Sequence, residues 1–191
     1  MKKQKRILDI IIASVLLLIT LPIMILVAIT IKLDSRGPIF YYYRGQTKKM
    51  PVYRLGKNGK PFRYFKFRTM VHDPANPGHK KITRLGRFLR CWHLDELPEF
   101  LIVLSGNMSL VGPRPLSKEA AKLFPLEYCR NLSVHPGITG QAQIAGGRSN
   151  PPEKIIATTE EYIQTWRLKK DLIILLKTPL MIVVQCNLFE H

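Results

Sequence analysis

Acidic residues are scarce in this chain. Its 191 residues include 13 Asp and Glu against 30 Lys and Arg, and the formal net charge is +17. Such an excess of positive charge predicts a polyanionic partner, which can be a nucleic acid, an anionic membrane surface or a phosphorylated substrate.

Cysteine is also rare. Cys91, Cys129 and Cys186 are far apart, odd in number and show no metal-binding spacing such as C-x-x-C. We therefore expect no disulfide framework, which fits a reducing, cytosolic setting. Repeats and low-complexity tracts are absent, and the length indicates one domain large enough to bury a core of its own.

Charged residues are missing from residues 10–31, a run of 22 positions near the amino terminus. As a helix this run would be roughly 33 Å long at about 1.5 Å per residue, enough to cross a hydrocarbon core of about 30 Å. No small-x-small cleavage site follows it, which argues against a secretory signal peptide. The segment is therefore expected to lie in a membrane.

Pro22 lies at the centre of this apolar segment, and its missing backbone donor should kink the helix there. The Thr20 hydroxyl is close enough in sequence to help satisfy a freed carbonyl group. Both flanks are basic, so the positive-inside rule gives no orientation. A kinked transmembrane helix and a re-entrant segment that returns to the same face both fit these features.

The rest of the chain predicts an α+β fold that is mainly helical. Asn58-Gly59 separates β-prone residues 53–55 and 62–65, which indicates a small β-hairpin. Residues 74–79 read as a loop. Residues 82–92 form a basic amphipathic pattern, with Leu85, Phe88 and Leu89 on one face, which suits either an anionic membrane surface or the core. Further helices are expected over residues 119–130, 153–169 and 172–188, the last as an interfacial or core helix.

Asp95 and Glu96 form an adjacent acid pair in this basic chain. Arg114 follows between two prolines, and three arginines precede the pair: Arg84, Arg87 and Arg90. Carboxylates can hold a divalent cation or attack phosphorus, while arginines neutralise phosphoryl oxygens. The alternative is a solvated helix on which Asp95 and Glu96 only pair with the arginines.

In this order and spacing, these segments resemble the bacterial sugar transferase family, the monotopic phosphoglycosyl transferases. The resemblance runs nearly end to end and is to the small form of the family, without a large multi-span domain before the core. It rests on residues 5–9, 32–38, 56–62, 66–70, 82–90, 94–98, 107–115 and 136–140.

The resemblance implies an enzyme on the cytosolic face of the bacterial inner membrane. Such enzymes move a sugar 1-phosphate from a UDP-sugar to polyprenyl (undecaprenyl) phosphate, the first membrane step in making exopolysaccharide, capsule, O-antigen or glycoprotein. The implied cofactor is Mg²⁺, and the implied partners include anionic inner-membrane lipids but no nucleic acid.

The resemblance also assigns roles to residues. Asp95 and Glu96 are the catalytic and metal-binding pair, and we expect Asp95 to attack phosphorus and form an aspartyl phosphosugar. The substrate phosphates would be bound by Arg114, Arg90, Lys66 and Arg68. The amino-terminal helix is expected to break at Pro22 and re-enter, which divides the chain into a membrane part (1–36) and a catalytic part with interfacial helices (37–191).

Two positions depart from the family pattern. Leu21 stands where the family often has Ser, so hydroxyl support for the bend would have to come from Thr20. Thr159 stands where the family often has Asp, so Glu160 or Glu161 would have to replace that acid, or its role is absent. The change at Thr159 keeps open a catalytically idle family member that acts as a scaffold. A basic, membrane-tethered nucleic-acid- or lipid-binding protein would explain the charge but not the acid pair or Arg114.

Overall fold

The computed structural model describes residues 3–41, 43–44, 49–50, 52–71, 81–125, 128, 133–146 and 150–189. The loop predicted over residues 74–79 lies outside these ranges. The helices are α1 (Lys3–Asp34), α2 (Arg84–Cys91), α3 (Glu99–Leu104), α4 (Lys118–Ala121), α6 (Gln141–Ile144), α7 (Pro152–Gln164) and α8 (Leu168–Phe189), with 3₁₀ helices η1 (Lys57–Gly59) and η2 (Leu94–Glu96). The strands are β1 (Tyr43–Arg44), β2 (Lys49–Met50), β3 (Val52–Leu55), β4 (Pro61–Tyr64), β5 (Ser109–Val111) and β6 (Gly137–Thr139). The predicted mainly helical α+β class is confirmed.

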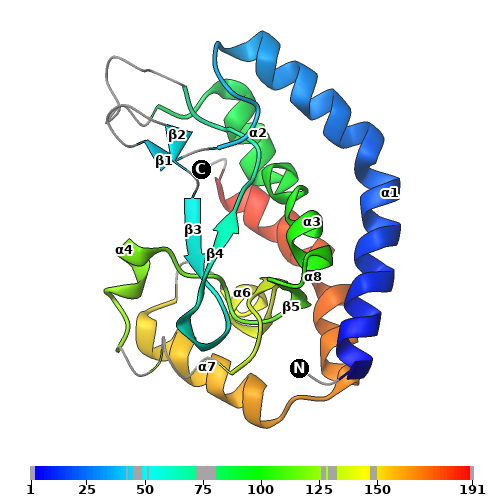
Figure 1. The fold of residues 1–191 in the computed structure, drawn as a ribbon, viewed down its shortest axis with the longest axis vertical. Coiled ribbons are helices and arrows are strands. Elements are labelled where there is room, and N and C mark those ends of the chain that lie inside the picture. Colours follow the sequence, from blue (N-terminus) through cyan, green and yellow to red (C-terminus); the bar gives the residue numbers. More distant parts are fainter. Residues whose placement is uncertain are drawn as a thin grey trace.

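Helix α1 forms one long edge of the molecule, and α3 packs along it (Figure 1). It is helical at every residue through Pro22 and bends along its length rather than separating into two helices. Most of its apolar side chains are exposed. Among the described residues, α1 is the helix whose length and composition suit a membrane. The re-entrant path stays a prediction, as does the domain boundary at residue 36.

The Thr20 hydroxyl has a different partner from the one that the sequence suggested. It donates to the Leu16 carbonyl at 2.7 Å. Pro22 lacks the N–H that would otherwise bind the Leu18 carbonyl, four residues earlier. Thr20 therefore does not satisfy the carbonyl that the proline frees.

Buried polar contacts hold the start of α1 against the rest of the fold. Lys5 Nζ lies 2.6 Å from Asp171 Oδ2 in α8, and Tyr162 and Trp166 donate to the same carboxylate at 2.7 and 3.0 Å. Asp9 accepts hydrogen bonds from the Ser109 hydroxyl and the Leu110 amide at the start of β5. Because these buried polar groups are paired, none of them is left with an unsatisfied charge or hydrogen bond, and the contacts fix the position of α1.

Arg68 holds the other end of α1. Its guanidinium donates to the Ile31 and Ser35 carbonyls at 3.2 and 2.8 Å and to the Pro38 carbonyl at 2.7 Å. The last carbonyl groups of a helix have no partners within the helix, so Arg68 completes the end of α1. Both ends of α1 are thus bound to the folded domain.

The predicted hairpin is confirmed as β3 and β4, which pair antiparallel with Val52 opposite Tyr64. Asn58 and Gly59 both take positive φ at the turn, 56° and 68°, as Asn-Gly turns require. In Figure 1 the hairpin lies on the side of α3 that faces away from α1.

Strands β5 and β6 form a second, parallel pair that could not be foreseen from local sequence. Ser109 lies opposite Gly137 and Val111 opposite Thr139. A Cβ atom on Gly137 would lie 2.1 Å from the Gly112 amide nitrogen, so this close approach requires glycine. This strand pair fixes the position at which the Gly112-Pro113-Arg114 segment leaves β5.

Two hydrophobic clusters fill the interior. One lies between the hairpin, α3, β5 and the last helices, and its buried members include Phe62, Val103, Val111 and Ile174. The other joins the second half of α1 to α2 and the segment after β4; its buried members are Met24, Val27, Ile31, Phe67 and Leu89.

Two features of α2 bear on the predictions from the sequence. Leu89 is buried and Leu85 is partly buried, but the third residue of the predicted apolar face, Phe88, is 54% exposed.

Cys91 at the end of α2 forms a disulfide with Cys186 in α8, with the Cα atoms 4.7 Å apart. The sequence predicted no disulfide framework, and it gave no local signal for this single bond because the two cysteines are 95 residues apart. Cysteine usage therefore does not support a reducing compartment.

The later helices differ from prediction mainly at their ends. α7 ends at Gln164 and α8 begins at Leu168, so the helix expected over 153–169 stops early. α4 covers only Lys118–Ala121 of the helix expected over 119–130; residues 126, 127, 129 and 130 lie outside the description. α8 buries Ile174 in the core and leaves Leu176 80% exposed; its interfacial location stays a prediction.

Replacing Asp171 by Ala should leave the Lys5 ammonium buried without its carboxylate. We expect the free energy of unfolding to fall by about 3–5 kcal/mol. Thermal unfolding in detergent micelles measures the loss. Glu161→Gln is the control, because Glu161 pairs with Lys170 at the surface, where ion pairs contribute little. Equal unfolding midpoints for the two variants would contradict this prediction.

Candidate active site

The acid pair lies on η2, a single 3₁₀ turn between α2 and α3. His93 precedes the turn in the left-handed conformation, with φ of 53°, and Pro98 begins the next helix as its N-cap residue. The Phe67 amide donates to the Asp95 carbonyl at 2.9 Å and fixes the turn to the segment after β4. Both carboxylates are buried, Asp95 at 2% and Glu96 at 8% exposure. The solvated helix considered above is therefore excluded.

Two cations meet the acid pair from different segments. Lys66 Nζ lies 2.5 Å from Asp95 Oδ2 and 3.9 Å from Glu96 Oε1. Arg114 Nη2 lies 3.5 Å from Glu96 Oε1. Four of the predicted site residues, Asp95, Glu96, Lys66 and Arg114, are thus brought together by the fold.

The electrostatics of this cluster favour the ionised form of Glu96. Burial opposes ionisation, but the hydrogen bond with His93 and the charges of Arg114 and Lys66 outweigh it. Together they hold the pKa of Glu96 well below its usual range. His93 Nδ1 lies 3.1 Å from Glu96 Oε2. Glu96 therefore stays charged beside Lys66 and Arg114. Such a carboxylate can bind Mg²⁺, while the two cations can bind the oxygens of a phosphate group.

Glu99 is a third carboxylate of the site that the sequence reasoning missed. It is 3% exposed and accepts a hydrogen bond from the Tyr64 hydroxyl of β4. Burial, together with the negative charge of Glu96, raises the pKa of Glu99 to about 8. The spacing from Glu96 to Glu99 places two acids on one side of a helical turn, and this signal could have identified it.

Arg90 and Arg68 lie outside this cluster of side chains. The Arg90 Nε donates to the Thr69 hydroxyl at 2.8 Å, where α2 packs closely on the Thr69 backbone. A Cβ atom on Gly86 would lie 2.0 Å from the Thr69 carbonyl oxygen. The Arg68 side chain is used at the end of α1, as described above, so we leave it out of the phosphate site proposed below.

The acid turn rests on the second half of α1. Leu94 and Leu97, which flank the acid pair, pack against the cluster that contains Met24, Val27 and Ile31. These three residues follow Pro22 in the sequence. The apolar helix and the charged site are therefore in contact through one layer of side chains.

Thr159 is 3% exposed, and its hydroxyl accepts a hydrogen bond from Tyr128 at 3.2 Å. Glu160 is exposed, and Glu161 binds Gln141 and Lys170 at the surface. Neither acid contacts Asp95 or Glu96 among the described interactions, so a replacement of the missing acid by Glu160 or Glu161 finds no support in their positions.

The two carboxylates at η2 suit a Mg²⁺ ion that is also bound by substrate phosphates. Mg²⁺ is usually held by one or two carboxylates together with substrate phosphates, and Asp95 and Glu96 provide such a pair. In the described part of the chain, no group of three or more His, Cys, Asp or Glu side chains is arranged to hold a metal ion by itself. The residues present therefore fit a metal that arrives with a diphosphate.

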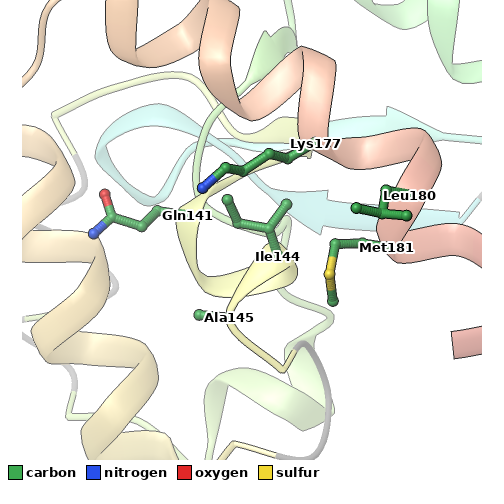
Figure 2. Close-up of a pocket in the computed structure, with 6 residues that line it drawn as sticks. All are labelled: Gln141, Ile144, Ala145, Lys177, Leu180 and Met181. Atoms are coloured by element: carbon green, nitrogen blue, oxygen red, sulfur yellow. The ribbon is translucent and has the colours of Figure 1, made fainter. Parts of the chain in front are cut away.

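A cavity of about 380 Å³ lies elsewhere, between α6 and α8 (Figure 2). Its lining includes Ile144, Leu180 and Met181, and the Lys177 amine extends toward Gln141. None of the predicted site residues contributes to the lining. The acid cluster, rather than this cavity, holds the groups that can do chemistry on phosphates.

Comparisons with known proteins agree with this chemistry. A family model described as bacterial sugar transferase matches residues 1–185. A UDP-glucose:undecaprenyl-phosphate glucose-1-phosphate transferase of Caulobacter vibrioides is 38% identical, over 92% of this chain and 68% of the relative. An enzyme of the same name from Escherichia coli K12 is 38% identical over 91% of this chain. The exopolysaccharide production protein ExoY of Rhizobium meliloti is 33% identical, over 91% of this chain and 83% of the relative. The chain spans 39% of the Escherichia coli relative.

The raised pKa of Glu99 predicts a pH dependence of stability. Between the ordinary value of 4.5 and about 8, the folded protein keeps Glu99 protonated while the unfolded chain ionises it. The folded state then binds more protons, so stability should fall as the pH rises through this window. Glu99→Gln should flatten the fall and raise the unfolding midpoint at the alkaline end.

Thermal midpoints measured across this window, in buffer with EDTA, test the effect. Glu119→Gln is the control, because Glu119 is exposed and the pKa of its carboxyl is lowered, chiefly by hydrogen bonds from its own backbone amide and Ser117. It should leave the slope between the two pH limits unchanged. A wild-type slope in Glu99→Gln would show that Glu99 is already ionised in the folded protein.

Proposed function

Because this chain belongs to the bacterial sugar transferase family, we propose that it transfers a sugar 1-phosphate from a UDP-sugar to undecaprenyl phosphate. The observation that carries the proposal is the buried Asp95 carboxylate in contact with Lys66, beside the Glu96–Arg114 pair and on a turn that rests on α1. This arrangement combines a nucleophile, phosphate-binding cations and an apolar helix.

The first step is attack by Asp95. One of its carboxylate oxygens bonds to the β-phosphorus of the UDP-sugar, the bond from that phosphorus to the bridging oxygen breaks, and UMP leaves with the oxygen. Lys66 and Arg114 neutralise the phosphoryl oxygens as charge develops. The product is an aspartyl phosphosugar, which is a reactive acyl phosphate.

The second step regenerates the enzyme. A phosphate oxygen of undecaprenyl phosphate attacks the same phosphorus, and the bond to the Asp95 oxygen breaks. The sugar is then linked through a diphosphate to the lipid, and the carboxylate is free. Two steps through one carboxylate avoid the direct approach of two bulky anions.

Asp95 and Glu96 are the residues that would hold Mg²⁺. When bound, the metal would offset the negative charge of the diphosphate. Glu96, with its lowered pKa, remains charged for this role through most of the pH range. Loss of UMP release on chelation, and its recovery on adding Mg²⁺, tests this assignment.

We place the enzyme on the cytosolic face of the inner membrane, with α1 entering the bilayer and the polyprenyl chain of the acceptor beside it. The high positive charge would strengthen contact with anionic lipids. A path for α1 that enters and leaves on the same face keeps both of its polar ends with the folded domain.

Labelling of single cysteines placed at Lys3 and Ser35 tests this path. A membrane-impermeant thiol reagent should reach both positions from the same side of inverted vesicles. The background protein needs Cys91, Cys129 and Cys186 replaced by Ser and should retain activity. Labelling of the two positions from opposite sides would establish a spanning helix.

The catalytic role of Asp95 predicts that Asp95→Asn lowers the rate of UMP release by about a thousandfold or more. The assay presents a panel of UDP-sugars, one at a time, with undecaprenyl phosphate and Mg²⁺ and measures UMP. Asn keeps the size of the side chain, so the thermal midpoint shows whether the variant is folded. Equal complementation of a glycan-deficient cell by mutant and wild type would instead indicate an inactive member that serves as a scaffold.

A further inference from the structure

Arg54 is a cation of strand β3 that the reaction described above does not use. Its Nε atom is buried and has no hydrogen-bond partner among the described residues. The structure likewise gives its guanidinium no ion pair with any carboxylate in the described ranges. A guanidinium cannot lose its charge in a protein, and a buried donor without a partner costs free energy. An anionic ligand would satisfy both requirements.

Arg54 adjoins the acid cluster through Tyr64. The centre of its guanidinium lies 5.0 Å from the centre of the Tyr64 ring. The hydroxyl group of the same tyrosine donates to Glu99. Arg54 therefore stacks on a side chain that is itself part of the site, and this stacking holds the guanidinium in place.

The backbone places Arg54 beside the segment of Arg114. The amide of the next residue, Leu55, donates to the Leu116 carbonyl at 2.8 Å, and the two residues form a bridge between β3 and the chain after Arg114. Two arginines thus come from neighbouring, hydrogen-bonded segments. Arg114 contacts Glu96, whereas Arg54 lies beyond Tyr64.

Carboxylates do not balance the charge of Arg54. Glu119 in α4 senses the charge of Arg54, but its carboxyl is exposed, and Arg54 lowers the pKa of Glu119 less than the hydrogen bonds from its own backbone amide and Ser117 do. Lys66 and Arg114 differ from Arg54 in this respect, because each of them lies against a buried carboxylate, Asp95 and Glu96 respectively. Within the described ranges, Arg54 therefore lacks the contact with a buried carboxylate that Lys66 and Arg114 each have.

We propose that Arg54 binds the α-phosphate of the sugar nucleotide, the phosphate that leaves with UMP. This inference rests on the proposed function and assigns a different task to each cation. Lys66 and Arg114 bind the phosphoryl group that is transferred, and Arg54 binds the group that departs. A charged, bidentate donor on the leaving phosphate stabilises it as the bond to the β-phosphorus breaks.

The donor nucleotide, rather than the lipid acceptor, is the ligand that the fold favours. Arg54 lies on the hairpin, which is on the side of α3 facing away from α1 (Figure 1). The phosphate of the acceptor carries a polyprenyl chain that belongs with the apolar helix. A soluble nucleotide has no such constraint and can approach the hairpin directly.

Arg54→Met should raise the KM for the UDP-sugar and the inhibition constant of UMP by about ten- to hundredfold, the value of a hydrogen bond to a charged group. The KM for undecaprenyl phosphate should stay unchanged. Arg54→Lys keeps the charge but loses the planar fork, and an intermediate effect is expected. Initial rates with each substrate varied in turn provide all three constants.

Arg63→Met is the matched control, because Arg63 is an exposed arginine on the other strand of the same hairpin. It should leave every constant at the wild-type value. An unchanged KM for the UDP-sugar in folded Arg54→Met would overturn the proposal. A raised KM for undecaprenyl phosphate alone would also overturn it and assign Arg54 to the acceptor. If Arg54→Met does not fold, Arg54→Lys provides the same comparison.

A binding measurement separates this inference from the proposed function. Calorimetric titration of the wild type, Arg54→Lys and Arg63→Met with UMP needs no turnover. If the wild type binds UMP more tightly than Arg54→Lys but releases none from any UDP-sugar, the proposed reaction fails and the nucleotide site stands. If UMP release is normal but UMP binds equally to all three proteins, the reaction stands and the role of Arg54 is wrong.

Discussion

The mutual repulsion of three buried carboxylates is the constraint on which the rest of this structure depends. Asp95, Glu96 and Glu99 lie within five residues of each other, on one short turn and the start of the next helix. Lys66 and Arg114 offset the first two, and the third is relieved by keeping its proton. Tyr64 ends β4 and Lys66 follows it, and Arg114 follows β5, so the two strand pairs position these groups at the turn.

The second organising feature is that α1 is part of the folded domain rather than an attached anchor. Its first turns bind α8 and β5, its end binds Arg68, and its second half carries the turn with the acid pair. A movement of α1 relative to the domain would displace Leu94 and Leu97, and with them the carboxylates. Membrane position and site geometry are thereby coupled through direct packing.

Sequence patterns predicted the parts of the structure that rest on local chemistry. Asn58-Gly59 predicted the hairpin, and unusual charge drew attention to Asp95, Glu96 and Arg114, whereas Lys66 came from the family resemblance. Sequence patterns did not predict interactions between residues that are far apart in the chain. The Ile31 and Ser35 carbonyl groups that accept hydrogen bonds from Arg68 lie more than thirty residues away, and no local feature distinguishes a helix-end arginine from a phosphate-binding one. The Cys91–Cys186 bond and the parallel β5–β6 pair were hidden for the same reason.

The contact between Lys5 and Asp171 joins residues 166 positions apart, and this has a consequence for how the protein is made. Lys5 leaves the ribosome long before Asp171, so an α1 that met the membrane during synthesis would do so while Lys5 still lacked this partner. The carboxylate arrives only with the last long helix, near the end of synthesis. Until then the Lys5 ammonium needs water or lipid headgroups around it, and the contact that fixes the start of α1 forms only when the chain is almost finished.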